Sequence, residues 1–242
     1  NVSAIYPLLI VGAIGSFVVA MVTIFVKKIA MFTAPIYAVL EGLFIGSFSA
    51  IVQSQFPDIP IVLQDYPPST GVYFSVELLN KLFTDLPNLK ILKHEEAPGL
   101  RKITQFRADE AKGNRRRVSV LVGNGALYLP QELNRSVDGA MTGFAFAEMM
   151  VQVCAIHAAG DTEEAEDLFD AYLPLVRHEQ QIGIGLALRK EVLRRRGIIS
   201  SAATRKPGPA IDTTDEEELT ALLNRLNRNL EALGKEPYRY SG

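Results

Sequence analysis

The sequence predicts an α/β domain that follows two membrane-spanning helices. The first 52 of its 242 residues carry only three side chains that are charged at pH 7, whereas charged residues make up 21% of the whole chain. Beyond this stretch, short apolar runs alternate with segments of helical spacing, a pattern typical of βα units around a parallel sheet. These two observations indicate a membrane region at 1–52, a junction at 53–58 and an α/β domain at 59–242.

Two long apolar runs predict the membrane-spanning helices. Ala4–Val26 has no charged side chain in 23 residues, and Met31–Val52 has one in 22, so each run is long enough to cross a bilayer. A signal peptide is the alternative for the first run, but it would have a basic start and a shorter apolar stretch. Because Lys27-Lys28 separates the runs, we expect a two-helix transmembrane hairpin with its turn in the cytoplasm.

One acidic residue, Glu41, lies near the centre of the second apolar run. An ionised carboxylate at that depth is costly, so Glu41 should be protonated, paired or directed to a polar cavity. Two interpretations stay open: a neutral Glu41 hydrogen-bonded to the neighbouring helix, and a role in an ion or proton pathway. The small residues Gly42, Gly46, Ser47 and Ser49 are expected to let the two helices approach closely.

The second region is predicted to contain four short strands, each followed by a helix. We expect the strands at Ile59–Leu63, Leu89–Leu92, Arg117–Val122 and Gly139–Thr142. Helical spacing places the intervening helices at Ser75–Thr84, Leu100–Asp109, Pro130–Ser136 and Ala147–Ala159. Three more helices are expected at Thr162–His178 with a break at Pro174, at Gly185–Arg196 and at Asp215–Leu233. The prolines and the glycine of residues 64–71 predict a loop.

Three of the predicted strands end in polar or glycine-rich residues. Gln64-Asp65 follows the first strand, Lys93 the second and Gly123-Asn124-Gly125 the third. Sites in parallel sheets and barrels form at the carboxyl ends of the strands, so these residues should meet at one rim. The sequence therefore predicts a functional site at this rim.

Lys93 is the candidate reactive residue of that site. A lysine forms a Schiff base when its amine is partly neutral near pH 7, and burial beside apolar residues such as Leu92 favours this state. Glu95 and Glu96 have the opposite effect, because nearby carboxylates favour the charged amine. In a strand, the Lys93 side chain should point away from those of Leu92 and His94. The residues alone leave two interpretations open, a Schiff-base nucleophile and a lysine salt-bridged at a strand end.

Five motifs resemble, in this order, the dihydrodipicolinate synthase / N-acetylneuraminate lyase family. They are IVLQDYPPSTGVYFS, LKHEEAPGLRKI, VLVGNGALYLPQEL, VDGAMTGFA and IGIGLALRKEVLRRRG, and the resemblance covers about residues 57–230. It implies an α/β fold that is the C-terminal half of a (β/α)8 TIM barrel with extra C-terminal helices, preceded here by the predicted transmembrane hairpin.

The same resemblance implies a function and a set of site residues. Lys93 would form a Schiff base with pyruvate or a 2-keto-3-deoxy acid, in an aldolase, lyase or dehydratase reaction that uses no cofactor. Gly123, Asn124 and Gly125 would lie at the substrate, and backbone near Met141 would face the keto acid, where a donor would stabilise developing charge.

Two departures from this family bear on activity. The family usually carries a proton-relaying tyrosine at the end of the fifth strand, where this chain has Gln64. Branches with sugar-acid-like substrates lack that tyrosine, and the chain resembles them more. The first four strands, with the threonine-bearing loop that grips the substrate carboxylate, have no counterpart, and the predicted hairpin stands in their place. We therefore expect impaired catalysis.

A second resemblance concerns the first region. The stretch APIYAVLEGLFIGSFSAI, Ala34–Ile51, resembles the Bax inhibitor-1-like family of membrane proteins, and the similarity covers about residues 1–52. That family is associated with ion leak, calcium in particular, through about seven helices, and two helices cannot enclose such a pathway. The alternative function is thus a membrane protein fragment of this class with a non-catalytic soluble passenger.

Composition and charge give the remaining expectations. Arginines at 115–117 and 194–196 could contact nucleic acid, but a pI near 6.0 and the lack of interleaved aromatic residues favour solvated side chains and no nucleic-acid partner. No Cys/His spacing indicates a metal, and the single Cys154 excludes an internal disulfide. The unpaired strand edges of a half-barrel predict a homo-oligomer.

The two regions make conflicting demands on location. Residues 4–52 predict attachment to a membrane, whereas the lyase-like part taken alone is expected in the cytoplasm. A cytoplasmic Lys27-Lys28 turn would place the α/β region on the other side of the membrane. We interpret the chain as a fusion of two unrelated fragments. The expected ligand of the second fragment is a small 2-keto acid.

Overall fold

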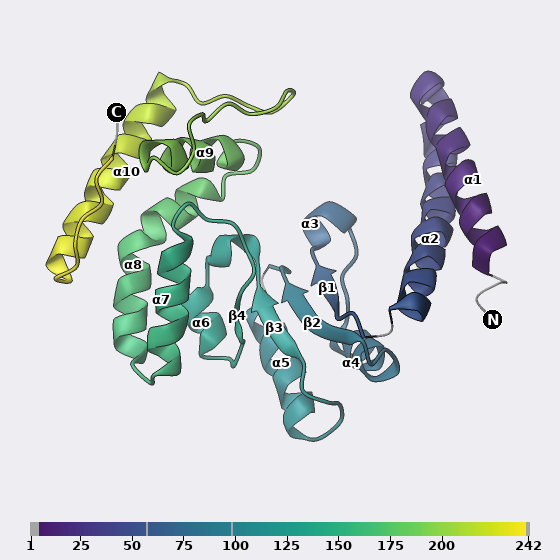
Figure 1. Ribbon diagram of the computed structural model, residues 1–242, viewed down its shortest axis with the longest axis horizontal. Helices are drawn as coiled ribbons and strands as arrows, with labels where there is room; N and C mark the ends of the chain where they lie inside the picture. The colour runs from purple at the N-terminus through teal and green to yellow at the C-terminus, as the bar shows by residue number, and fades with distance from the viewer. Residues whose placement is uncertain (1–4, 57, 98, 241–242) are drawn as a thin grey trace. The chain divides into compact units, whose positions relative to one another are not determined.

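The computed structural model describes residues 5–56, 58–97 and 99–240. The chain forms two units that divide between Ile61 and Val62 (Figure 1). Ala4, the first residue of the first predicted span, and Pro57, in the predicted junction, lie outside the described residues. Each unit is described by itself below.

The first unit consists of two long helices, α1 (Ile5–Phe25) and α2 (Ala30–Gln55), with the short 3-10 helix η2 (Lys27–Ile29) between them. The helices approach most closely at Gly12, where a Cβ would come within 2.5 Å of the Phe44 backbone nitrogen. Thr23 Oγ1 also donates a hydrogen bond to Thr33 Oγ1 on the other helix at 2.7 Å. Two apolar helices at the N-terminus are therefore confirmed.

One detail of the predicted helix contact is corrected. Gly42 and Gly46 have no atom of another segment within 4 Å of the position that a Cβ would take, whereas Gly12 of α1 lies against the Phe44 backbone; Ser47 is buried. Glu41 is partly buried, and of its two open interpretations the hydrogen bond to the neighbouring helix is not formed among the described residues.

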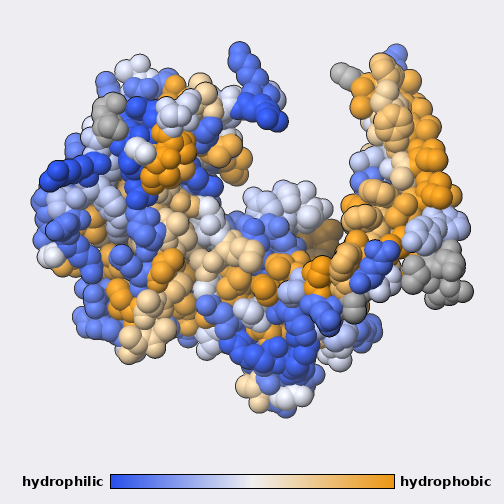
Figure 2. All heavy atoms as spheres, in the orientation of Figure 1, coloured by the Kyte–Doolittle hydropathy of each residue, from blue (hydrophilic) through white to orange (hydrophobic). Residues whose placement is uncertain are grey.

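The surface of the first unit is strongly apolar (Figure 2). Phe17, Phe25 and Met31 are each at least 66% exposed, and many other large apolar side chains of α1 and α2 are exposed to a smaller extent. Only 11% of each apolar stretch is buried, whereas the core helix of a soluble protein would be mostly buried. By length and composition, Ile5–Phe25 and Ala30–Val52 are long and apolar enough to cross a membrane.

The second unit is built on a parallel sheet whose order follows the chain, β1–β2–β3–β4. The strands are β1 (Ile61–Asp65), β2 (Leu89–His94), β3 (Ser119–Val122) and β4 (Gly139–Ala140). In the register, Lys93 of β2 lies opposite Leu121 of β3, and Val122 of β3 lies opposite Ala140 of β4. The predicted α/β fold with a parallel sheet is confirmed, and the half-barrel stays a prediction.

Helices follow each strand and continue after the sheet. They are α3 (Pro67–Thr70), α4 (Val76–Asp85), α5 (Leu100–Ala111), α6 (Leu129–Leu133), α7 (Ala147–Ala158), α8 (Thr162–Glu179), α9 (Gly185–Arg195) and α10 (Thr213–Ala232). Local chemistry fixes several helix starts: Ser75 Oγ accepts a hydrogen bond from the Leu78 N–H at the start of α4, and Asp212 and Asp215 form a capping box at the start of α10.

Several predicted boundaries are corrected. The first strand begins two residues later than predicted and includes Gln64-Asp65, because the Asp65 carbonyl still pairs with the Glu95 N–H. The short helix α3 lies inside the predicted loop. Pro174 does not break its helix: α8 runs unbroken through it, because one lost backbone hydrogen bond is outweighed by the packing of neighbours such as Leu175 and Val176, which are buried.

Burial alternates along β3 and along the second half of β2, and it defines the faces of the sheet. In β2, Leu92 and His94 are buried, while Ile91 and Lys93 are partly exposed. In β3, Val120 and Val122 are buried and Leu121 is only partly so. The core therefore lies between one face of the sheet and the helices, and Lys93 lies on the other, more open face.

Most arginines of the two runs pair with carboxylates and several are buried, which corrects the expectation of solvated side chains for them; Arg117, at 57% exposed, stays solvated. The Arg115 side chain is fully buried: it pairs with Glu110 at 2.8 Å and its guanidinium stacks 3.5 Å from the Phe106 ring centroid. Arg195 forms an ion pair with Glu191 at 2.7 Å and is only 12% exposed. These arginines stabilise the fold, since buried guanidinium groups need charged or aromatic partners.

Candidate functional site

Lys93 lies one residue before the end of β2, on the open face of the sheet. Its side chain is 21% exposed, and its Nζ lies 2.9 Å from Glu95 Oε1. As predicted from strand alternation, it points away from Leu92 and His94, which are both buried on the other face. The amine is thus accessible and has a carboxylate as its direct neighbour.

The Glu95 carboxylate connects three strand ends. Its Oε1 accepts a hydrogen bond from Gln64 Nε2 at 2.5 Å in addition to the contact with Lys93, and its Oε2 accepts one from the Asn124 N–H at 3.2 Å. The Asn124 side-chain amide also donates to the Glu95 carbonyl. Glu95 therefore holds Gln64 from β1, Lys93 from β2 and Asn124 from the end of β3 around one negative charge.

Sequence reasoning considered Glu95 only as a nearby charge and missed this role. The signal that could have found it is its spacing: two residues after Lys93, a side chain in extended backbone returns to the same face of the sheet. The neighbouring Glu96 turns away, and its carboxylate pairs with Lys102 at 2.6 Å. The side chains of these two adjacent glutamates therefore lie on opposite faces of the sheet at the end of β2.

The glycine-rich end of β3 is shaped by close contacts. A Cβ at Gly123 would lie 2.1 Å from Glu95 Cγ, so only glycine leaves room for the Glu95 side chain. Gly125 has a φ of +65°, and a Cβ there would lie 2.0 Å from Gln180 Nε2. Its N–H donates a hydrogen bond to Thr142 Oγ1 at 2.7 Å. Of the sequence-predicted residues, Gly123 and Asn124 therefore contact Glu95, the partner of Lys93, whereas Gly125 contacts Gln180 and Thr142 instead.

Met141 follows the last residue of β4, and its N–H donates a hydrogen bond to the Val122 carbonyl at 2.8 Å. That N–H is therefore engaged within the sheet and is not available to a substrate. The Met141 side chain is 36% exposed. Its predicted role at a keto acid stays a prediction, and it would depend on the carbonyl or the side chain.

A buried ionic cluster supports the strand ends from the opposite face. Asp65 is fully buried, with Lys102 Nζ at 2.9 Å and His94 Nδ1 at 3.4 Å from its Oδ2. Burial by itself raises the pKa of Asp65, but His94 and Lys102 outweigh this effect and hold the pKa below its usual value of 3.8. The cluster fixes the ends of β1 and β2 relative to each other.

A cavity of about 510 Å³ lies on this opposite side, between residues of α5 and α6. His94, Glu96, Asn124 and Glu132 contribute to its wall, and Lys93 does not line it. Burial raises the pKa of the Glu132 carboxyl to about 7 despite the nearby Arg135. This cavity thus lies on the face of the sheet opposite to the Lys93 amine.

Each of the two units resembles a different class of protein. The second unit resembles the dihydrodipicolinate synthase family, and the N-terminal helices resemble Bax inhibitor-1-like membrane proteins, as inferred from the motifs. Residues 1–83 match the family described as Bax inhibitor 1 like, a match that extends past both helices into α4.

Particular relatives support the lyase resemblance. The chain is 29% identical over 173 residues to L-2-keto-3-deoxyarabonate dehydratase from Azospirillum brasilense, over 70% of this chain and 53% of that protein. It shares 43% identity and a TM-score of 0.70 with the crystal structure of dihydrodipicolinate synthase from Rhodopseudomonas palustris, over 76% of this chain and 61% of the other. The chain therefore spans about half to three-fifths of the length of these relatives.

A further neighbour supports the fold alone. It is a prophage protein of the dihydrodipicolinic acid synthase family from E. coli K12, whose structure was solved in complex with pyruvate. The identity is 20% and the TM-score is 0.63, over 76% of this chain and 60% of that one.

Proposed function

We propose that the second unit is a Schiff-base-forming lyase unit, and that Lys93 condenses with pyruvate or a 2-keto-3-deoxy acid. The observation that carries this proposal is the position of Lys93, on the open face at the carboxyl end of β2 with its amine against Glu95. Among lyase reactions we favour dehydration of a 2-keto-3-deoxy sugar acid. The similarity to L-2-keto-3-deoxyarabonate dehydratase and the Gln64 in place of a tyrosine both support this choice.

The contacts of Glu95 suggest how the chemistry would proceed. The Lys93 ammonium must lose a proton before its nitrogen attacks the keto carbon, and Glu95 Oε1 at 2.9 Å is placed to accept it. The same proton can then return to the hydroxyl of the carbinolamine, which leaves as water to give the iminium. In the dehydratase, the iminium acidifies the adjacent C–H, and loss of that proton expels the β-hydroxyl as a second water.

Gln64 and Gly123 act on this chemistry by positioning the carboxylate. Gln64 Nε2 donates to the same Oε1 that faces Lys93, and Gly123 leaves the space in which the Glu95 side chain lies. A fixed carboxylate needs no rearrangement when the proton moves, which lowers the barrier. We further propose that catalysis by this chain alone is weak, because it aligns with only 53% and 61% of the length of two relatives and would lack the substrate-positioning groups of a whole barrel.

Reductive trapping tests the proposal. The full chain in detergent is incubated with pyruvate and borohydride, and its peptides are analysed by mass spectrometry. We expect the adduct on Lys93 alone, in an amount of less than one adduct per chain. Lys93→Arg should abolish it, and the matched variant Lys90→Arg, on an exposed residue of the same strand, should retain it. An adduct on another lysine would contradict the role of Lys93, and stoichiometric trapping would contradict the weak activity.

The alternative function is a membrane protein fragment of the Bax inhibitor-1-like class with a non-catalytic soluble passenger. The match of residues 1–83 to that family and the exposed apolar surface of α1 and α2 favour membrane association. Washing cell membranes with alkaline carbonate tests the membrane part of this alternative, and reductive trapping on Lys93 tests whether the second unit is non-catalytic. We expect the chain to stay in the membrane fraction, and release into the wash would contradict a spanning first unit.

A further inference from the structure

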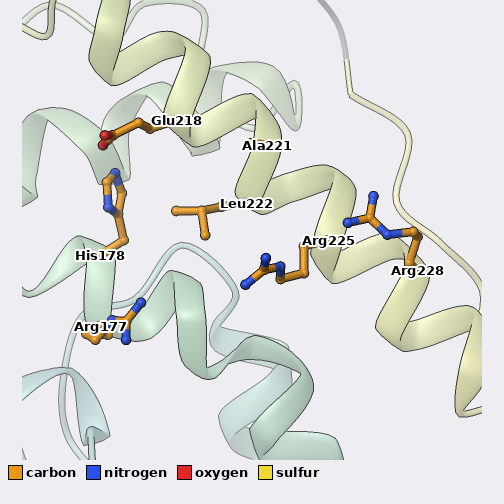
Figure 3. A pocket seen from close by; sticks show the side chains of 7 residues that line it. All are labelled: Arg177, His178, Glu218, Ala221, Leu222, Arg225 and Arg228. Carbon is orange, nitrogen blue, oxygen red and sulfur yellow. The ribbon is translucent and has the colours of Figure 1, made fainter.

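We propose that a groove between α8 and α10 binds a small organic anion with two or more negatively charged groups. The groove has a volume of about 350 Å³ and is separate from the site at Lys93. Three arginines, Arg177, Arg225 and Arg228, line it together with His178 and Glu218 (Figure 3). This inference does not depend on the proposed lyase function.

The groove is formed by the last turn of one helix and one face of another. Arg177 and His178 belong to the end of α8. On α10, the lining residues recur every three or four positions from Glu218 through Leu222 and Arg225 to Arg228, so they share one face. Figure 3 shows Arg177 and Arg225 on either side of Leu222, with Glu218 at the end nearest His178.

The three guanidinium groups lack the carboxylate partners found elsewhere in the fold. Arg107, Arg189 and Arg196 each form an ion pair with an aspartate or a glutamate. In the described part of the chain, no acidic side chain lies within ion-pair distance of Arg177, Arg225 or Arg228. The three exposed cations lie along the groove, and an anion bound there would neutralise part of their charge.

His178 gives an independent indication of a ligand. Its Nε2 is buried and has no hydrogen-bond partner among the described residues. Its other ring nitrogen, Nδ1, lies 3.2 Å from Gln181 Nε2. A buried nitrogen without a partner loses its hydration with no compensation, so an oxygen of a bound anion would satisfy it.

The shape and chemistry of the groove define the ligand class. Guanidinium groups bind carboxylates and phosphates through paired N–H donors, and the volume is within the range of small-molecule sites. Ala221 and Leu222 offer an apolar floor for a short carbon body. Glu218 lies at the His178 end and weakens binding of an anion there, so one charged group should contact His178 Nε2 and Arg177, and the other should lie toward Arg225. A tricarboxylate or a small phosphorylated compound fits this arrangement.

Titration calorimetry of the full chain in detergent tests this proposal. Citrate represents the carboxylates and pyrophosphate the phosphates, both at constant ionic strength. We expect at least one probe to bind with one site per chain, and the probe that binds more tightly identifies the source class. The double variant Arg177→Gln, Arg225→Gln should weaken binding at least tenfold, since each removes a charge-assisted contact.

Two controls make the result decisive. The matched double variant Arg205→Gln, Arg239→Gln removes the same charge at exposed positions outside the groove and should change affinity less than twofold. Glu218→Gln should tighten binding at least twofold, a gain that a damaged fold would not give. Absence of binding by both probes, an equal loss in the matched variant, or weaker binding by Glu218→Gln would overturn the proposal.

Discussion

At the scale of single residues, the candidate site depends on which carboxylate forms an ion pair with which lysine. Glu95 and Glu96 are neighbours in sequence, yet the first pairs with Lys93 and the second with Lys102 on the other face. Asp65, next to Gln64, likewise faces away from the site and toward Lys102. Charged side chains therefore lie on both faces of the sheet at the strand ends, and Lys93 lies on the open face.

Asp65→Asn should destabilise the fold. Removing one partner of a buried ionic cluster leaves the others uncompensated, so the free energy of unfolding should fall by about 3 kcal/mol at pH 7. Because the folded pKa of Asp65 is depressed, its stabilisation is fully present above 3.8, the usual value, and is lost as the pH falls through the folded pKa. Urea denaturation followed by circular dichroism measures both effects.

The control for this experiment is Asp85→Asn, since Asp85 is 51% exposed and pairs only with the exposed Lys81. Surface pairs contribute little, and we expect a change below about 0.5 kcal/mol. If Asp65→Asn were as mild as Asp85→Asn, or kept the pH dependence of the parent chain, the buried cluster would not have the role described.

Gly123→Ala tests the space that Glu95 occupies. The added Cβ would lie 2.1 Å from Glu95 Cγ, so the Glu95 side chain must move away from Lys93. We expect a loss of about 1–3 kcal/mol in the free energy of unfolding and slower trapping of pyruvate on Lys93. Unchanged trapping in a chain that is destabilised would show that Glu95 is not needed at the amine.

At the scale of elements, local patterns in the sequence predict most of the second unit. Each strand and helix expected from apolar spacing between residues 59 and 233 is present, with ends shifted by a few residues. What could not be predicted depends on tertiary packing. Pro174 stays helical because the surrounding faces of α8 are buried, and the link from Glu95 to Gln64 and Asn124 needs the register of three strands.

The capping box of α10 gives a prediction at this scale. Asp212 accepts a hydrogen bond from the Asp215 N–H at 2.9 Å and the Asp215 carboxylate accepts one from the Asp212 N–H. Asp212→Ala should lower the free energy of unfolding by about 1 kcal/mol in the same urea assay. Glu217→Ala, an exposed residue of the same turn, should change it by less than about 0.5 kcal/mol, and equal effects would argue against the cap.

At the scale of the whole molecule, the sheet has two edges that predict association. Within the described residues, β1 and β4 each have a strand neighbour on one side only. Ile61 and Val62 of β1 are 38% and 40% exposed, so this edge is apolar as well as unpaired. Edges of this kind pair readily with a second chain.

We therefore expect the full chain to form dimers or larger species in detergent, measured by size-exclusion chromatography with light scattering. Val62→Lys places a charge at the edge and should shift the population toward monomer. Val72→Lys adds the same charge at an exposed position outside the sheet and should leave the population unchanged. A monomeric parent chain would contradict this prediction.

The contacts of Glu95 also bear on how the chain reaches its fold. Gln64 and Asn124 lie 31 and 29 residues from Glu95, and each strand pairs with the next one along the chain. Closing loops of this length costs chain entropy before any contact is made, and parallel pairing of this kind forms slowly. The rim that carries Lys93 should consequently assemble late, after the helices that connect its strands have formed.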